Sequence, residues 1–149
     1  MSHVSIAVAA ISDYDVLNRL YLAWGYRGGI AQGDVVYVAT MDRRTVGLVR
    51  RTSEEGVLML RGMQVDPDVQ RQGIGTHLLR ALVDDLPAAE CYSIPFDHLI
   101  GFYRQGGFNT LNESDAPAFL RQRIGGYRAQ GRAVVLMRRP GPLDLERAS

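Results

Sequence analysis

The chain has 149 residues, the length of one compact domain, and it is long enough to bury an ordinary core without disulfides. Hydrophobic residues make up 46% and charged residues 22%, which is the composition of a folded globular protein rather than of a disordered one. Seventeen basic and sixteen acidic residues leave a net charge of +1. This balance argues against a dedicated nucleic-acid or anionic-membrane binder, because such proteins usually carry a basic surplus.

A single cysteine, Cys91, excludes an internal disulfide, and no set of cysteine and histidine residues has the spacing of a zinc site. The apolar run Val4–Ile11 lacks the basic start of a signal peptide. It is also much shorter than the roughly 20 apolar residues that a membrane-spanning helix needs. We therefore expect a cytoplasmic protein with no metal site and no membrane partner.

Hydrophobic periodicity, punctuated by glycine and proline, divides the chain into strands and helices. Turn signals at 42–44 and 53–56 predict an antiparallel meander in the first half. In chain order, the predicted elements are a strand at 4–9, a helix at 12–24, strands at 35–40, 45–52 and 57–65, a helix at 72–85, a strand at 89–94, a helix at 97–104, a strand at 108–111, a helix at 116–127 and a strand at 133–138.

This order of elements predicts an α/β (α+β) protein with a mixed, mostly antiparallel sheet of six to seven strands flanked by helices. No internal repeat divides the chain, so we expect a single domain over residues 1–139. Residues 140–149 contain Pro-Gly-Pro and little apolar surface, and they are expected to form a loosely held tail.

The most informative segment joins the predicted strand at 57–65 to the predicted helix at 72–85. It contains Gly73-Ile74-Gly75 at the helix start, where backbone N–H groups are unpaired and the dipole favours negative charge. Glycine lets an anion approach the backbone closely, while Arg71 adds positive charge and Thr76 adds a hydroxyl donor. The segment suits a diphosphate group, and the alternative is a tight strand-to-helix turn that needs small residues.

Two other phosphate-binding patterns do not fit this segment. A dinucleotide fingerprint needs a third glycine at position 78, where this chain has Leu78. A P-loop needs a glycine followed by lysine and then serine or threonine, a pattern that the chain lacks.

The sequence resembles the GNAT superfamily of acyl-CoA N-acyltransferases in two blocks. The first is Gln70–Gly75, with the letters QRQGIG, which follows Val65-Asp66-Pro67 and matches the family signature of Gln or Arg, two residues, Gly, one residue, and Gly or Ala. The second is Gly101–Phe108, with the letters GFYRQGGF, which corresponds to the family's Phe-Tyr-x-x-x-Gly-Phe at the usual distance. The resemblance extends over residues 4–138.

This resemblance implies acetyl-CoA as the cofactor, held between fourth and fifth strands that splay apart. The diphosphate would contact backbone amides of the first block, and the pantetheine arm would pair with the fourth strand. Many members carry an asparagine seven residues before the tyrosine, where this chain has Phe96, with Asp97 or His98 as partial replacements. The implied cofactor-binding residues are Met63, Gln64, Val65, Gln70, Arg71, Gln72, Gly73, Ile74, Gly75, Thr76 and Phe102.

Acetyl transfer to an amine needs a neutral amine and a proton donor for the departing thiolate. The resemblance gives the donor role to Tyr103, for which core packing of an aromatic ring is the alternative. The fourth strand lacks the carboxylate that family members often use as a base, and Glu54 and Glu55 are expected at a solvated hairpin tip. The base is therefore unassigned, with a water chain or an already neutral amine as the alternatives. Cys91 is expected to be a buried apolar residue, which favours direct attack in a ternary complex.

The family analogy bounds the acceptor groove by the loop after the first helix and the loop before the last strand. Aromatic and arginine side chains there suit a small amine that also bears an anionic group. Core packing is an equally supported interpretation of Trp24. The candidate acceptor residues are Trp24, Tyr26, Arg27 and Arg61.

The leading prediction is an acetyl-CoA-dependent N-acetyltransferase that acts on a small-molecule primary amine. A protein N-terminus or lysine is the alternative acceptor, and a non-catalytic acyl-CoA-binding module is the alternative function. The presence of Tyr103 favours the enzyme, and the missing acid on the fourth strand favours the module. Dimers are common among such proteins, and the sequence favours neither a homodimer nor a monomer.

Overall fold

The structure is a computed structural model that describes residues 3–86 and 90–141. Its strands are β1 (Val4–Val8), β2 (Val35–Met41), β3 (Arg44–Glu54), β4 (Val57–Val65), β5 (Cys91–Ser93), β6 (Asn109–Thr110) and β7 (Met137–Arg139). Its α-helices are α1 (Tyr14–Ala23), α2 (Ile74–Asp84), α3 (Ile100–Arg104) and α4 (Ala118–Ala129).

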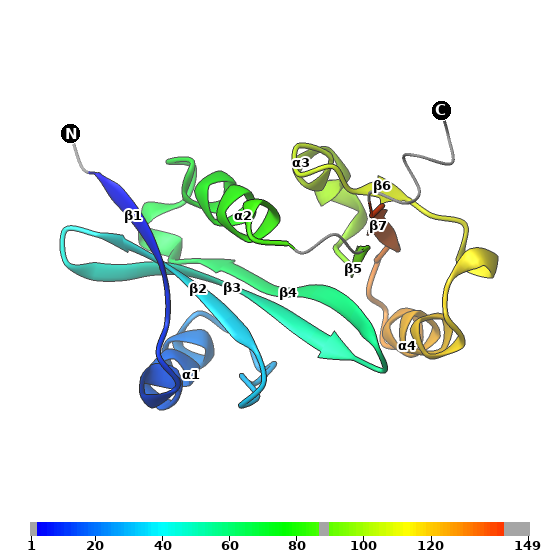
Figure 1. The fold of residues 1–149 in the computed structure, drawn as a ribbon, viewed down its shortest axis with the longest axis horizontal. Coiled ribbons are helices and arrows are strands. Elements are labelled where there is room, and N and C mark those ends of the chain that lie inside the picture. The colour runs from blue at the N-terminus through cyan, green and yellow to red at the C-terminus, as the bar shows by residue number, and fades with distance from the viewer. Residues whose placement is uncertain (1–2, 87–89, 142–149) are drawn as a thin grey trace. The chain divides into compact units, whose positions relative to one another are not determined.

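The strands form one seven-stranded sheet in the order β1-β2-β3-β4-β5-β7-β6 (Figure 1). The pairings of β1 with β2, β2 with β3, β5 with β7 and β6 with β7 are antiparallel, whereas β4 and β5 are parallel. The predicted mixed and mostly antiparallel sheet with flanking helices is therefore confirmed. Most of the predicted tail, residues 142–149, lies outside the described residues, as do residues 87–89 near the start of the predicted fifth strand.

The chain divides into two compact units, and the division passes through β4. The first unit consists of Met1–Gly56 and Leu60–Leu86, and the second consists of Val57–Met59 and Pro87–Ser149. The first unit contains α1, α2, β1 to β3 and the second part of β4. The second unit contains the start of β4 together with β5 to β7, α3 and α4.

In the first unit, α1 and α2 lie on opposite faces of the β1–β3 sheet (Figure 1). Tyr14, Leu17 and Tyr21 are buried on α1 because they recur at helical spacing, and they pack with Val36 of β2 and Leu48 of β3. Burial of an apolar side chain such as Leu17 or Leu48 stabilises the fold by about 1.5–3 kcal/mol. This packing holds α1 and the chain that follows it against β2 and β3.

On the opposite face of the sheet, α2 packs against Gly47 of β3. A β-carbon at Gly47 would stand 2.9 Å from Cδ1 of Leu78 and 3.1 Å from Cγ2 of Ile74, which is closer than packed atoms lie. Glycine therefore allows α2 to approach β3 closely. Since Ile74 is the first residue of α2, this contact also fixes where the helix begins relative to the strand.

Two short hairpin turns connect β2 to β3 and β3 to β4, as the turn signals predict. The backbone has positive φ at both Asp42 and Arg43, and again at both Glu55 and Gly56. Left-handed backbone at both central residues gives the twist that two-residue hairpins need. The second turn begins only at Glu55, so Glu54 is the last residue of β3.

In the second unit, α3 and α4 lie on opposite sides of the short strands β5 to β7 (Figure 1). Leu120 and Ile124 of α4 are buried with Met59, Tyr92 and other apolar residues. The parallel ladder that the described residues form between β4 and β5 is short, with Leu58 opposite Cys91 and Met59 opposite Tyr92. This ladder joins the start of β4 to β5 within the second unit.

The last strand is shorter than the sequence predicts. An apolar run predicts a strand at 133–138, but β7 begins at Met137. Before it, Val134 forms an isolated bridge with Phe96, and the N–H of Val135 donates to the carbonyl of Pro95 at 3.0 Å. These partners lie in the loop after β5, so the apolar residues extend the core without extending the ladder.

Candidate active site

The segment between β4 and α2 forms an open helix start. Gly73 precedes the first residue of α2 with φ of 78°, and no side chain caps this helix. The first hydrogen bond of the helix runs from the N–H of His77 to the carbonyl of Gly73 at 3.1 Å. The N–H groups of Ile74, Gly75 and Thr76 therefore have no acceptor within the helix and are available to a ligand.

The surroundings of this helix start fit an anionic group. A β-carbon on Gly73 would have no neighbour within 4 Å, so the space in front of the glycine is open. Arg71 and Gln72 are exposed beside it, and Arg71 has φ of 68° although it is not glycine. A left-handed non-glycine residue costs about 1–3 kcal/mol, and such residues concentrate at functional sites.

The side chains of two predicted cofactor residues, Ile74 and Gln70, are turned to the protein itself. Ile74 is buried in the core, so only its backbone N–H is available to a cofactor. Gln70 turns back and donates from Nε2 to the carbonyl of Val65 at 3.4 Å, which joins the loop to the end of β4. Met63, Gln64 and Val65 at that end are half-buried. The first unit thus brings together all the predicted cofactor residues except Phe102.

Strand β4 has an irregular backbone immediately before Met63. Gly62 has φ of 69°, and its carbonyl accepts a hydrogen bond from the hydroxyl of Tyr21 on α1 at 2.8 Å. A β-carbon on Gly62 would lie 2.6 Å from the Tyr21 hydroxyl and 3.0 Å from Nε of Arg50. Both the backbone angle and the space therefore require glycine at this position.

We expect Gly62→Ala to lower the free energy of unfolding by about 2–4 kcal/mol, because left-handed strain and overpacking add. Urea unfolding measures the change. Gly56→Ala is the matched control, since Gly56 has φ of 82° but open space where its β-carbon would stand. In that control, backbone strain alone should lower the free energy of unfolding by only about 1–2 kcal/mol. Equal losses in the two variants would contradict the close packing at Gly62.

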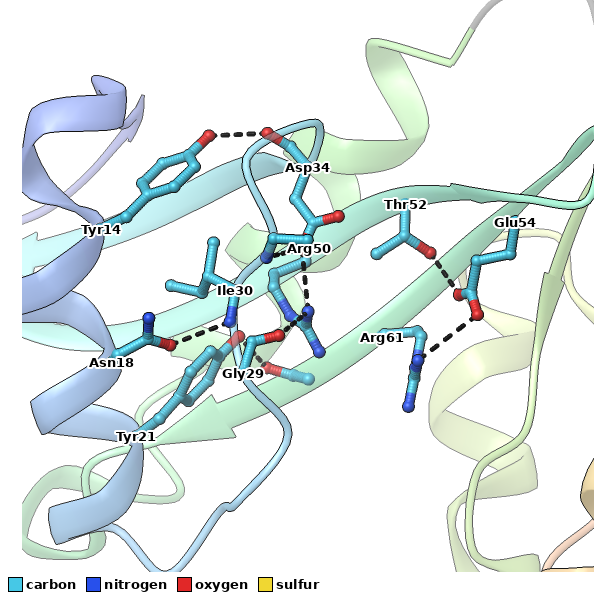
Figure 2. A network of polar contacts seen from close by, with 12 residues as sticks. Tyr14, Asn18, Tyr21, Gly29, Ile30, Asp34, Arg50, Thr52, Glu54 and Arg61 are labelled. Atoms are coloured by element: carbon cyan, nitrogen blue, oxygen red, sulfur yellow. Dashed lines mark hydrogen bonds and ion pairs between the residues drawn. The ribbon is translucent and has the colours of Figure 1, made fainter.

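Next to Gly62 lies a buried charged cluster that is absent from the sequence-based expectations (Figure 2). Nη1 of Arg50 lies 2.9 Å from Oδ2 of Asp34, and the two side chains are only 3% and 7% exposed. The same guanidinium donates to the carbonyl of Gly29 at 2.6 Å and to the hydroxyl of Tyr26 at 2.7 Å. Its Nε is buried without a hydrogen-bond partner among the described residues.

Other contacts hold the same loop, residues 25–34, which we call the α1–β2 loop. The N–H of Ile30 donates to Oδ1 of Asn18 on α1, and the N–H of Ala31 donates to Oδ2 of Asp34, both at 2.9 Å. The hydroxyl of Tyr14 donates to the backbone carbonyl of Asp34 at 2.6 Å (Figure 2). The loop is therefore tied both to α1 and to β3.

Burial sets the ionisation of the tyrosines around this cluster. It raises the pKa of Tyr21 well above its ordinary value, although nearby Arg50 opposes the shift. Burial also raises the pKa of Tyr14, and the charge of Asp34 adds to the effect. On β2, burial raises the pKa of Tyr37, whose hydroxyl donates to Asp85. These hydroxyls stay protonated as hydrogen-bond donors near neutral pH.

A pH dependence of stability follows from the raised pKa of Tyr21. Above about pH 10 the unfolded chain loses this proton while the folded protein keeps it, so stability falls as pH rises. Each such tyrosine contributes a slope of about 1.4 kcal/mol per pH unit. We expect Tyr21→Phe to reduce the slope between about pH 10 and 11.5 by this amount, measured by urea unfolding. Identical slopes in the two proteins would contradict the shift.

Further along β3, Glu54 lies beside Arg61 of β4 (Figure 2). Oε1 of Glu54 is 3.5 Å from Nη1 of Arg61, and the hydroxyl of Thr52 donates to Oε2 at 2.6 Å. The side chains of Glu54 and Arg61 are 20% and 32% exposed. The sequence predicts Glu54 at a solvated hairpin tip, whereas in the structure it is a partly buried, hydrogen-bonded residue of β3.

The other predicted acceptor residues lie at or near the start of the α1–β2 loop. Trp24 and Tyr26 are half-buried and pack against the core under α1, and the Tyr26 ring centroid is 4.5 Å from that of Tyr21. Arg27 is exposed. The core-packing interpretation of Trp24 thus agrees with its contacts, whereas Tyr26 joins the core to the buried guanidinium.

In the second unit, the predicted proton donor lies on α3. Tyr103 is 5% exposed, and its ring makes edge-to-face contacts with Phe102 at 5.0 Å and Phe108 at 6.2 Å between centroids. Gly107 follows with φ of 86° and ends this short helix segment. Cys91 on β5 is fully buried, which agrees with the prediction of a small apolar role.

Comparison with known proteins decides the family. The family profile described as an acetyltransferase (GNAT) domain matches residues 32–110, more than half of the chain. The chain belongs to the GNAT acetyltransferase family. Its matched region contains the β4–α2 loop and Tyr103, so both GNAT blocks lie inside it. No curated protein sequence matches the chain significantly.

Solved structures with the GNAT fold resemble the chain over nearly its whole length. The ribosomal-protein-S18-alanine N-acetyltransferase from Escherichia coli has a TM-score of 0.67 at 18% identity, over 93% of this chain and 94% of that one. Rv2747 from Mycobacterium tuberculosis, solved with CoA and NLQ, has a TM-score of 0.67 at 16% identity, over 91% and 98%. These likenesses establish the fold.

A third similar structure is longer than this GNAT chain. N-acetylglutamate synthase from Neisseria gonorrhoeae, solved with coenzyme A and N-acetyl-glutamate, has a TM-score of 0.66 at 18% identity. The match covers 93% of this chain but only 35% of the synthase, so the chain spans about a third of that protein's length. Among the described residues, no helix is long and apolar enough to cross a membrane.

Proposed function

We propose that this GNAT protein transfers an acetyl group from acetyl-CoA to the primary amine of a small molecule. The observation that carries the proposal is the uncapped start of α2 behind left-handed Gly73, in a chain of the GNAT family. An open row of helical N–H groups beside exposed Arg71 suits a diphosphate. Solved GNAT structures that contain coenzyme A are consistent with this cofactor.

The residues present fit the cofactor in two places. The N–H groups at the start of α2, with Arg71, Gln72 and Thr76, would bind the diphosphate. The half-buried backbone of Met63–Val65 would pair with the pantetheine arm, as an added strand does at a free sheet edge. Acetyl-CoA supplies an activated thioester. The protein must align this thioester with the amine, remove a proton from the amine and protonate the departing thiolate.

Tyr103 is the residue we assign to protonation of the departing thiolate. Its ring is locked between Phe102 and Phe108, which limits the positions that the hydroxyl can take. A phenol and a thiol are acids of similar strength, so proton transfer between them is nearly balanced. Direct attack of the amine in a ternary complex needs no covalent intermediate, consistent with the burial of Cys91.

The amine must lose a proton before or during attack. The described part of β4 carries no carboxylate, since its nine residues read VLMLRGMQV. A water chain along the strand carbonyls, or an amine that binds already neutral, would satisfy this need. Glu54 faces Arg61 beside this strand, so it stabilises a positively charged partner there rather than replacing the missing base.

The contacts of Glu54 and Arg61 favour a small acceptor that carries an anionic group. A guanidinium that is 32% exposed and held by a contact of 3.5 Å can bind an anion without losing a tight ion pair. The GNAT proteins of similar fold include one named for a ribosomal-protein alanine and one named for glutamate. A protein acceptor is therefore the second candidate.

The deciding experiment measures thiol release from acetyl-CoA over a panel of amines. The panel contains amino acids, the same amino acids as carboxamides, polyamines and peptides with free N-termini. We expect release with small amines, strongest where a carboxylate is present. Release with peptides alone would establish the protein acceptor. Binding of acetyl-CoA without release for any amine would establish the non-catalytic module.

A further inference from the structure

The α1–β2 loop has a conformation that its own sequence does not specify. It contains four glycines within ten residues, Gly25, Gly28, Gly29 and Gly33, and each one widens the range of backbone angles available to the loop. Nevertheless the loop is held at three of its residues by one side chain from β3. Arg50 donates to the carbonyl of Gly29 and to the carboxylate of Asp34 (Figure 2). It also donates to the hydroxyl of Tyr26.

A need for stability alone does not explain this arginine. Buried ion pairs can often be replaced by apolar residues without loss, because desolvation of the two charges offsets their attraction. The buried Nε of Arg50 also lacks a hydrogen-bond partner among the described residues, which is a further cost. The planar guanidinium, in contrast, gives several donors at fixed angles, and that geometry can specify one loop conformation.

The same cluster contacts the strand predicted to bind the pantetheine arm. Tyr21, whose ring lies 5.8 Å from the Arg50 guanidinium, donates to the carbonyl of Gly62. Nε of Arg50 lies 3.0 Å from where a β-carbon of Gly62 would stand. Gly62 immediately precedes Met63, so one buried cluster holds both the α1–β2 loop and the irregular point of β4.

We propose that Arg50 is a positioning residue that fixes the α1–β2 loop against β4 and so sets the site for the acceptor amine. The proposal rests on the proposed acetyltransferase function. Arg50 is itself buried, so it acts through Tyr26, Gly29 and Asp34 rather than by touching the substrate. Loss of Arg50 should therefore affect binding of the acceptor more than binding of acetyl-CoA or the chemical step.

The test compares Arg50→Lys with Arg51→Lys. Lysine keeps the charge near Asp34 but cannot reproduce the fork of donors. Arg51 is the matched control because it is the next residue on β3 and makes a separate contact, from Nη1 to the carbonyl of Asp85 at 3.1 Å. Two quantities are measured: hydrogen exchange of the amides at 26–33, and the steady-state constants for both substrates.

For Arg50→Lys we expect loop amides to exchange at least about 10-fold faster and the acceptor KM to rise about 10-fold or more. The kcat and the KM for acetyl-CoA should stay within about threefold of the wild type. Arg51→Lys should change neither the exchange nor the acceptor KM. Unchanged loop exchange in Arg50→Lys, or a fall in kcat with the acceptor KM unchanged, would overturn the inference.

Two milder variants keep the inference testable if Arg50→Lys does not fold. Tyr26→Phe removes one acceptor of the guanidinium, and Asp34→Asn removes its charged partner with almost no change of shape. Each variant should raise the acceptor KM by about 3–10-fold. In the double variant, the rise in acceptor KM should be smaller than the product of the two single rises, because both substitutions act through one loop. Fully independent effects would overturn the inference. Failure of the proposed function would instead be seen as no thiol release by the wild type.

Discussion

Tyr103→Phe is expected to lower kcat about 100-fold or more while the protein stays folded and binds acetyl-CoA as before. General acid catalysis usually contributes about 10²–10⁴-fold. We expect the lower part of this range because a thiolate, with an ordinary pKa of about 8.5, leaves more easily than an alkoxide. The phenyl ring retains its contacts with Phe102 and Phe108, so the melting temperature should fall by less than about 4 °C.

The split between turnover and stability distinguishes a proton donor from a packing residue. Loss of a proton donor lowers kcat while the melting temperature is nearly unchanged, whereas loss of a packing contact lowers the melting temperature. Tyr127→Phe is the matched control, since Tyr127 is a partly buried tyrosine of the same unit. The control should keep kcat within about twofold of the wild type. Equal turnover by Tyr103→Phe and the wild type would remove Tyr103 from the mechanism.

Gly73→Ala is expected to weaken acetyl-CoA binding at least about 10-fold, which corresponds to about 1.4 kcal/mol. The new methyl group would stand in the open space in front of the helix start, where the diphosphate is proposed to bind. It would also strain a backbone with φ of 78°. The measurement is the rise in melting temperature with acetyl-CoA concentration, from which the dissociation constant follows.

The control separates loss of binding from loss of stability. Gly131 has φ of 82° and open space around its missing β-carbon, so Gly131→Ala introduces comparable backbone strain in a loop of the second unit. Both variants should lose about 1–2 kcal/mol of stability without ligand. Only Gly73→Ala should lose the response to acetyl-CoA. An undiminished response in Gly73→Ala would show that the cofactor does not approach this helix start.

Most of the sheet could be predicted because its signals are local. The turns at 42–44 and 53–56 are marked by their residues, and the run of threonine, valine and leucine between them identifies β3. The last strand was predicted too long because its apolar residues pack in the core, while the backbone of Val135 pairs with Pro95 of another loop. Apolar patterning reports burial, and it does not identify the partner of a backbone group.

The buried cluster around Arg50 was missed for a physical reason. Arginine is rarely buried, and the partners of Arg50 on the α1–β2 loop are distant in the sequence. One signal was present. Successive side chains of a strand point to opposite faces, so Val46, Leu48 and Arg50 lie on the same face of β3. Leu48 on that face is in the core, which places Arg50 at an inward-facing position. An arginine at an inward position needs an acid, and Asp34 supplies it.

Gly47 influences the candidate cofactor site indirectly, through the packing of α2 on β3. Because the missing β-carbon of Gly47 lets Ile74 and Leu78 pack directly on β3, this glycine also determines how close the start of α2, with its free N–H groups, lies to the strand. A substitution that pushed the helix outward by even a fraction of an ångström would displace every donor of the row together. The affinity for the cofactor would then depend on the distance between α2 and β3, even with the sequence of the β4–α2 loop unchanged.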